Sequence, residues 1–163
     1  MPFRIRPTTG EDQQWICRFI RDRWLADFVV AHGVVYYPHT LGGFLAETEE
    51  GSPVGLATYA IENSACELVT LDSLREGEGV GTGLIQRVSQ EACRSRCSRL
   101  WCVTTNDNLS ALRFYQKRGF RIVAVRPGAV ERSRVLKPSI PLLGIEGIPI
   151  RDEIELEFPL SPT

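Results

Sequence analysis

Alternation of apolar and polar residues predicts strands near both ends of the chain. Residues 3–6 alternate before Pro7, and residues 152–158 place isoleucine, leucine and phenylalanine between successive glutamates. Because neighbouring side chains of a strand point to opposite faces, the second of these segments is expected to have one face in water. Apolar runs bounded by turn residues predict further strands at 42–47, 54–59, 66–71, 99–104 and 120–125.

Helical spacing is clearest in the middle of the chain. A helix over residues 80–96 is predicted by an apolar residue at every fourth position, at Val80, Leu84, Val88 and Ala92. Asn108 supplies a capping side chain for a helix that is expected to run to Arg118, with Gly119 as its C′ glycine. Residues 11–31 also have helical character, and the pattern leaves open whether they form one helix or two.

Residues 127–150 are ambiguous, because Pro138, Pro141, Pro149 and three glycines interrupt them. A connection of this length is usually functional or mobile, although apolar packing is an alternative role. The packing would come from Leu142, Leu143 and Ile145. The segment also carries basic residues that either favour an acceptor with a negative group or only solvate the loop: Arg132, Arg134 and Lys137.

Composition describes an ordinary globular protein, which we expect to be a single domain over residues 1–163. Of these residues 43% are hydrophobic and 24% charged, and a chain of this length can bury a real core. The net charge of −1 gives no support to nucleic-acid binding. No apolar run is long enough to span a bilayer and the first residues do not form a signal peptide, so we expect a cytoplasmic protein without membrane partners.

The five cysteines form no disulfide framework. Cys93 and Cys97 would be neighbours on one helical face, so a metal pair is conceivable. No second pair matches them, and both histidines are far away in the sequence. Free thiols and no bound metal are therefore the preferred interpretation.

The most informative segment is a turn with four glycines at residues 75–83, between an apolar strand and the central helix. A helix that begins directly after such a turn offers free N–H groups to a phosphate or pyrophosphate. The Gly-Lys-Ser/Thr of a Walker A loop is absent. In the dinucleotide pattern Gly79 and Gly81 match, but Leu84 occupies the last glycine position. A turn without a ligand remains an alternative at this point.

A second segment favours a ligand. Residues 108–120 resemble the pattern Asn-x-x-Ala-x-x-Phe-Tyr-x-x-x-Gly-Phe of the GNAT acetyltransferase superfamily. Gly79-Val80-Gly81 resembles that superfamily's pyrophosphate loop, Arg/Gln-x-x-Gly-x-Gly/Ala, and the spacing between the two segments also fits. One departure is Glu76, at the position usually held by Arg or Gln. A carboxylate cannot pair with phosphate, so binding there would depend on backbone N–H groups.

The resemblance implies an α/β fold with a mixed, mostly antiparallel sheet flanked by helices, in which the fourth and fifth strands splay apart. It also implies an N-acetyltransferase that moves an acetyl group from acetyl-CoA to a primary amine of a small molecule or peptide. A non-catalytic CoA-binding regulatory module is the alternative function. A homodimer is the expected oligomer, because dimers are the commonest oligomeric state. Cofactor binding would fall to Leu71, Asp72, Gly77, Gly79, Val80, Gly81, Thr82, Asn108, Ala111 and Tyr115.

Helical geometry agrees with these roles. Asn108, Ala111 and Tyr115 are spaced at i, i+3 and i+7, so they share one face. The small Ala111 would let a pantetheine arm approach, and Asn108 would hydrogen-bond it. By resemblance, Tyr115 is the general acid, and a backbone N–H near Leu71 contacts the oxyanion.

A general base is harder to identify. Glu67 is the candidate, because simple alternation gives it the same side-chain direction as Leu71. Asp72 would then face the opposite way. The alternative for either residue is a solvated strand carboxylate, and superfamily members often use water chains instead.

Overall fold

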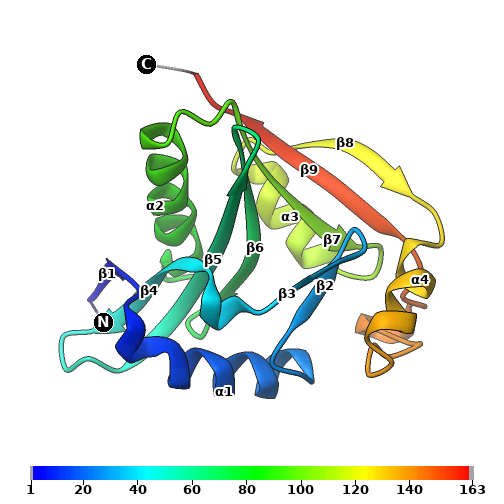
Figure 1. Ribbon diagram of the computed structural model, residues 1–163, viewed down its shortest axis with the longest axis horizontal. Helices are drawn as coiled ribbons and strands as arrows, with labels where there is room; N and C mark the ends of the chain where they lie inside the picture. The colour runs from blue at the N-terminus through cyan, green and yellow to red at the C-terminus, as the bar shows by residue number, and fades with distance from the viewer. Residues whose placement is uncertain (1, 162–163) are drawn as a thin grey trace.

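One sheet of seven strands carries most of the chain in the computed structural model, which describes residues 2–161 (Figure 1). The strands follow the spatial order β1-β4-β5-β6-β7-β9-β8, and every neighbouring pair is antiparallel except β6 and β7. The expected mixed, mostly antiparallel sheet is therefore confirmed. Its strands are β1 (Phe3–Pro7), β4 (Gly42–Thr48), β5 (Pro53–Glu62), β6 (Ala65–Ser73), β7 (Arg99–Thr105), β8 (Arg121–Arg126) and β9 (Glu153–Pro159).

Helices cover both faces of this sheet (Figure 1). The helices are α1 (Gln13–Trp24), α2 (Val80–Arg94), α3 (Leu109–Lys117) and α4 (Ala129–Leu136). Side chains of α2 and α3 form the larger core together with one face of the sheet, and α1 packs in a smaller core on the other face. The predicted apolar stripe of α2 is confirmed, because all of its members are buried: Val80, Leu84, Val88 and Ala92.

The parallel pair β6 and β7 separates along its length. Ala65–Glu67 pairs with Arg99–Trp101, and no pairing between the two strands continues beyond that point in the described residues. Figure 1 shows the two strands close together at one end and apart at the other. The expected splay of the fourth and fifth main strands is thus confirmed, and it opens the middle of the sheet.

A bulge in β6 changes which side chains face each way. Two successive residues of β5 pair with Leu68 and Thr70, which leaves Val69 as an extra residue of β6. An extra residue breaks the alternation of side chains along a strand. Glu67 therefore faces the side of the sheet that α1 covers, whereas Leu71 packs with the core on the α2 side. The prediction that these two side chains point the same way is wrong.

The N-terminal helical segment is shorter than predicted. Helix α1 ends at Trp24, and β2 (Val29–Ala31) then pairs with β3 (Val34–Tyr36) as a separate hairpin. Both residues of its turn have positive φ, 43° at His32 and 79° at Gly33, as a two-residue hairpin turn requires. Residues 29–31 are strand because β-branched valines pair across this turn, which outweighs a helical pattern.

Residues 127–150 contain helix α4 and a short 3₁₀ turn, Ile145–Gly147. Two of the basic side chains form hydrogen bonds with backbone carbonyls. Arg134 donates to the carbonyls of Ile140, Pro141 and Ile150. Lys137 donates to those of Trp24 and Phe28. The proposed apolar packing of this segment is wrong, because its three candidate side chains are exposed: Leu142, Leu143 and Ile145.

All five cysteines are free thiols, as predicted. In the part of the chain that the structure describes, no helix has the length and apolar character needed to cross a membrane.

Candidate functional site

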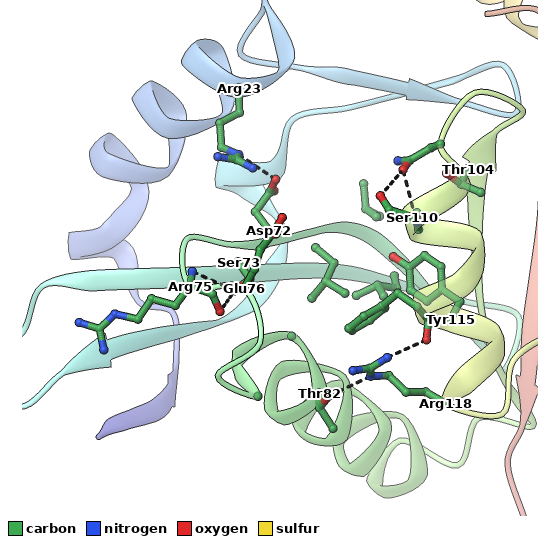
Figure 2. Close-up of a pocket in the computed structure, with 18 of the residues that line it drawn as sticks. Arg23, Asp72, Ser73, Arg75, Glu76, Thr82, Thr104, Ser110, Tyr115 and Arg118 are labelled. Carbon is green, nitrogen blue, oxygen red and sulfur yellow. Dashed lines mark hydrogen bonds and ion pairs between the residues drawn. The ribbon is translucent and has the colours of Figure 1, made fainter. Parts of the chain in front are cut away.

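A cavity of about 680 Å³ lies where β6 and β7 have separated. Its walls come from β6, the glycine turn, the first turn of α2, β7 and α3, and Figure 2 shows these elements around it. Most of the predicted site residues line it together, namely Leu71, Asp72, Gly77, Gly79, Gly81, Thr82, Asn108, Ala111 and Tyr115. Val80 and Glu67 do not line it: the Val80 side chain is in the core, and Glu67 is on the α1 side of β6.

The glycine turn has the geometry of an anion cradle. Gly77 and Gly79 adopt φ of 76° and 84°, which side chains rarely tolerate, and α2 begins directly afterwards. The first N–H groups of a helix have no partner within it, so they can bind a negative group at this end of the cavity. The turn is anchored at its start, because Ser73 Oγ donates to the Arg75 carbonyl and accepts from the Arg75 N–H.

Gly81 is required by packing rather than by its backbone angle. A Cβ at this position would lie 3.0 Å from Cζ of Phe114, tighter than ordinary van der Waals contact. The glycine therefore lets α2 and α3 approach each other closely. This contact joins the first turn of α2 to the α3 wall of the cavity.

Helix α3 presents the predicted face to the cavity. Asn108 is its N-cap, and Asn108 Oδ1 accepts hydrogen bonds from the Ala111 N–H at 3.2 Å and Ser110 Oγ at 3.3 Å. The carbonyl oxygen of this amide is thus used to start the helix, and the amide nitrogen is left as a donor. The Ala111 methyl leaves space between α3 and β6, one turn before Tyr115.

Tyr115 is almost fully enclosed, with 9% of its surface exposed. Its ring packs against Phe114 and Phe120, with centroids 5.5 and 5.2 Å away. Burial raises the pKa of the phenol well above its usual value, and Cys102 and Asp72 add to the shift. Figure 2 shows the hydroxyl directed away from α3 toward the space beside β6. The group therefore stays protonated and can donate a hydrogen bond there.

Asp72 ties the end of β6 to the end of α1. Its carboxylate accepts hydrogen bonds from Arg23 Nε at 3.0 Å and Trp24 Nε1 at 3.3 Å. Burial raises the pKa of this carboxyl group, and Arg23 opposes that shift. All three residues line the cavity, so α1 closes the cavity on the face opposite to α3 (Figure 2). The helical pattern of residues 11–31 gives no sign of this contribution of α1.

Glu67 belongs to a second polar cluster on the α1 face of the sheet. Its buried carboxylate accepts from the Tyr36 hydroxyl at 2.6 Å and contacts His32 Nε2 at 2.8 Å. The His32 backbone N–H donates to Glu153 Oε2 at 2.9 Å, and the imidazole lies 5.0 Å from the Trp101 ring. The hydrogen bond to the Glu67 carboxylate is the main cause that raises the pKa of His32, against the effect of burial.

The sequence contains a pattern that predicts the hairpin carrying His32 and Tyr36. Two apolar runs, at 29–31 and 34–36, flank exactly two turn residues, His32 and Gly33, which is the pattern of a tight hairpin. That hairpin places both ring side chains over β6. Glu67 is therefore neither in the cavity nor a simple solvated carboxylate, but a hydrogen-bonded member of a neighbouring cluster.

Solved structures with the same fold are numerous. An IAA acetyltransferase from Bacillus cereus ATCC 14579 superposes with a TM-score of 0.74 at 21% identity, and the match covers 98% of this chain and all of that one. A GNAT family acetyltransferase from Elizabethkingia anophelis has a TM-score of 0.70 at 20% identity, over 97% and 98% of the two chains. At these identities the likeness establishes the fold.

Sequence comparison extends this result. The chain is 43% identical to the uncharacterized protein YdhI of Bacillus subtilis (strain 168) over 150 residues, which are 92% of this chain and 94% of YdhI. The model of the acetyltransferase (GNAT) family matches residues 13–120, which include the glycine turn and the α3 face of the cavity. The chain therefore belongs to the GNAT acetyltransferase family.

Proposed function

We propose that this protein is an N-acetyltransferase that moves an acetyl group from acetyl-CoA to a primary amine of a small molecule or peptide. The observation that carries the proposal is one continuous cavity that joins the glycine turn at the start of α2 to the hydroxyl of Tyr115. Further support comes from similar structures, since the Elizabethkingia anophelis protein has acetyl-CoA bound and a Bacillus subtilis acetyltransferase is in complex with CoA.

The cavity suits CoA along its length. The N–H groups that follow Gly79 would hold the pyrophosphate through the positive end of α2. The amide nitrogen of Asn108 would donate to the pantetheine arm, which fits beside Ala111 because that side chain is only a methyl group. The separation of β6 from β7 leaves a route through the sheet from this arm to the α1 face.

The chemistry follows from groups on β6 and α3 that line the cavity. A neutral amine attacks the thioester carbonyl, and negative charge develops on the carbonyl oxygen. Beyond Glu67, no strand of the described residues pairs with β6 on the β7 side, so a backbone N–H near Leu71 is available to that oxygen. When the carbon–sulfur bond breaks, the thiolate receives a proton from the Tyr115 hydroxyl, which burial keeps protonated.

The acceptor amine must lose its proton on the other face of the sheet. We assign this task to Glu67 acting through His32, because the carboxylate is buried and already holds the imidazole at 2.8 Å. When Nε2–H of His32 donates to Glu67, Nδ1 is the basic nitrogen. The imidazole is partly exposed, with 23% of its side chain accessible, so a proton can reach solvent from it.

A non-catalytic CoA-binding module is the second candidate, and the observation that favours it is the departure of Glu76 from the superfamily's loop pattern. This carboxylate lines the cavity near the glycine turn, where it repels phosphate. The two candidates differ in turnover and not in binding. An enzyme transfers the acetyl group to an amine, whereas a regulatory module binds acetyl-CoA and leaves it intact.

The test is a panel of amines incubated with acetyl-CoA and the protein. Release of free CoA thiol would be followed by a thiol reagent, and the acetylated amine would be identified by mass spectrometry. We expect amine-dependent release above the hydrolysis seen without an acceptor. Binding of acetyl-CoA without any acetylated product across metabolite, antibiotic and peptide amines would favour the binding module.

A further inference from the structure

We propose that Arg118 supplies the positive charge for the CoA pyrophosphate, in the role that the missing Arg or Gln at Glu76 would otherwise fill. This inference rests on the proposed function and concerns the phosphate end of the same cavity. Arg118 is the C-cap residue of α3, more than thirty residues after the glycine turn in the sequence. It therefore reaches the start of α2 from a separate element of the cavity wall.

The guanidinium lies on the first turn of α2. Arg118 Nε donates to Thr82 Oγ1 at 2.8 Å, and Thr82 is the third residue of that helix. Arg118 Nη1 donates to the Phe114 carbonyl at 2.9 Å, and the guanidinium carbon is 3.5 Å from the centroid of the Phe114 ring. These contacts hold the charged plane in one orientation, as Figure 2 shows, beside the first N–H groups of α2.

The charge of Arg118 is not neutralised. Within residues 2–161, no carboxylate forms an ion pair with Arg118 and no protein acceptor bonds its Nη2. A guanidinium has five N–H donors, so several remain for a ligand. By contrast, Arg75 in the turn forms an ion pair with Glu78, 3.6 Å between nitrogen and oxygen. Arg118 is thus an available cation in the cavity wall.

A negative charge in the lining of the cavity favours such a cation. Glu76 contributes a negative charge to the lining close to the glycine turn. A diphosphate bound there would meet backbone N–H groups and a repelling carboxylate. A guanidinium presents two parallel donors to phosphate oxygens, and charge-assisted hydrogen bonds of this kind are stronger than those to neutral donors. Arg118 offsets the Glu76 charge and adds direct contacts to the phosphate oxygens.

Arg118 also borders a second cavity of about 600 Å³, which includes Gln86, Phe120 and Phe158 in its walls. Arg118 and Thr82 are shared by the two cavities. CoA carries a 3′-phosphate besides its pyrophosphate, so this second phosphate is an alternative partner for the same guanidinium. The proposal commits to the pyrophosphate, because the fixed Nε–Thr82 contact keeps the charge at the start of α2.

The experiment measures binding by calorimetry for the wild type, Arg118→Met, Arg118→Lys and Arg113→Met. Methionine keeps apolar contact with Phe114 and removes the charge. Arg113 is an exposed arginine of the same helix that does not line the cavity, so it is the matched control. The ligands are acetyl-CoA, acetyl-3′-dephospho-CoA and acetyl-pantetheine. The first has every phosphate group, the second lacks the 3′-phosphate, and the third has no phosphate. Melting temperatures without ligand check that each variant folds.

We expect Arg118→Met to weaken binding of acetyl-CoA and of its dephospho form by the same factor, roughly tenfold. Arg118→Lys should recover part of the loss, and acetyl-pantetheine should bind all four proteins equally. The loss should shrink as ionic strength rises. Arg113→Met should match the wild type with every ligand.

Three results would overturn the inference. The first is unchanged acetyl-CoA affinity in Arg118→Met. The second is a loss confined to acetyl-CoA, which would assign Arg118 to the 3′-phosphate. The third is an equal loss with acetyl-pantetheine, which would make the effect structural. Failure of the wild type to bind acetyl-CoA would instead remove the proposed function, and the inference with it.

Discussion

The Tyr115 side chain is fixed by the packing of its ring, since its hydroxyl has no hydrogen-bond partner among residues 2–161. Aromatic rings on both sides and nearly complete burial hold the phenol at the cavity wall. The raised pKa means that this group is a poor acid in the ground state. Its contribution therefore depends on proximity to a thiolate that forms only as the thioester breaks.

Tyr115→Phe removes the oxygen and keeps the ring, so packing and cofactor affinity should be preserved. We expect kcat to fall by roughly 100-fold, the lower end of what positioned acid–base groups contribute. Steady-state kinetics with the best amine of the panel and calorimetry with acetyl-CoA would measure both quantities. Tyr59→Phe is the control, because Tyr59 does not line the cavity. Turnover equal to that of the wild type would remove the acid role of Tyr115.

The His32–Glu67 pair makes stability depend on pH. The folded-state pKa of His32 is raised above the usual value of about 6.5, chiefly by its hydrogen bond to Glu67. Its stabilisation is therefore fully present below about pH 6.5 and is lost as pH rises through the raised folded value. Glu153 and Glu155 on β9 face the same imidazole and act in the same direction, while burial opposes them.

His32→Gln should therefore reduce the free energy of unfolding most at low pH, by about 1–2 kcal/mol, with a smaller difference in alkaline solution. Urea unfolding of both proteins between pH 5.5 and 9 would measure this difference. His39→Gln, which removes the other histidine of the chain, controls for the loss of an imidazole. A His32→Gln difference that is constant across this range would contradict the role of the charged pair.

At the level of single residues, local spacing predicted part of the site and tertiary contacts decided the rest. Asn108, Ala111 and Tyr115 were predictable because they share one helix, whose geometry fixes their common face. The contact partners of Arg118 and His32 were not predictable, because each lies on an element distant in the sequence. Their positions follow from how α3 meets α2 and how the β2–β3 hairpin folds over β6.

At the scale of elements, the glycine turn has two roles: its backbone adopts positive φ, and it shapes the end of the cavity where α2 begins. Gly79 and Gly51 have almost the same φ, 84° and 85°, and a Cβ at either would meet no atom within 4 Å. Gly51 lies in the turn between β4 and β5 and does not line the cavity. Substitution at Gly51 therefore measures the stability cost of a left-handed residue alone, whereas substitution at Gly79 adds any effect on cofactor binding.

Gly79→Ala and Gly51→Ala should each lower the free energy of unfolding by about 1 kcal/mol, the cost of a left-handed non-glycine residue. Only Gly79→Ala should also weaken acetyl-CoA binding, because relaxation of its strain moves the first N–H groups of α2. Urea unfolding and calorimetry would give the two quantities. Equal acetyl-CoA affinity in the two variants would show that the turn does not shape the binding site.

Predicted elements were most accurate where one strong pattern ran through the whole element. The α2 stripe and the strands of the main sheet match their predicted segments closely. Residues 29–36 were missed because valine-rich strands of three residues are too short to show a period against a neighbouring helix. The Val69 bulge reversed the expected direction of Glu67, since a bulge depends on pairing with β5 and leaves no mark in one strand's sequence.

At the scale of the whole molecule, the sheet consists of two halves joined at one end. One half is β1-β4-β5-β6 and the other is β7-β9-β8, and within residues 2–161 the strands of the two halves pair only through the short contact of Ala65–Glu67 with Arg99–Trp101. Beyond that contact, the cavity separates β6 from β7 where hydrogen bonds between the two strands would otherwise continue. A ligand that fills the cavity contacts both halves, so its binding energy also holds the sheet together.

Acetyl-CoA at 100 times its Kd should stabilise the folded chain by about 2.7 kcal/mol, which corresponds to a rise in melting temperature of about 5–10 °C. The accompanying protection from hydrogen exchange should be local. We expect slower exchange in β6 after Glu67, in β7 after Trp101 and in the glycine turn, whereas β1 and β4 at the far edge should change least. Mass spectrometry of exchanged peptides would measure this distribution. Uniform protection across the sheet would contradict a ligand that bridges the two halves, and an unchanged melting temperature would contradict acetyl-CoA binding itself.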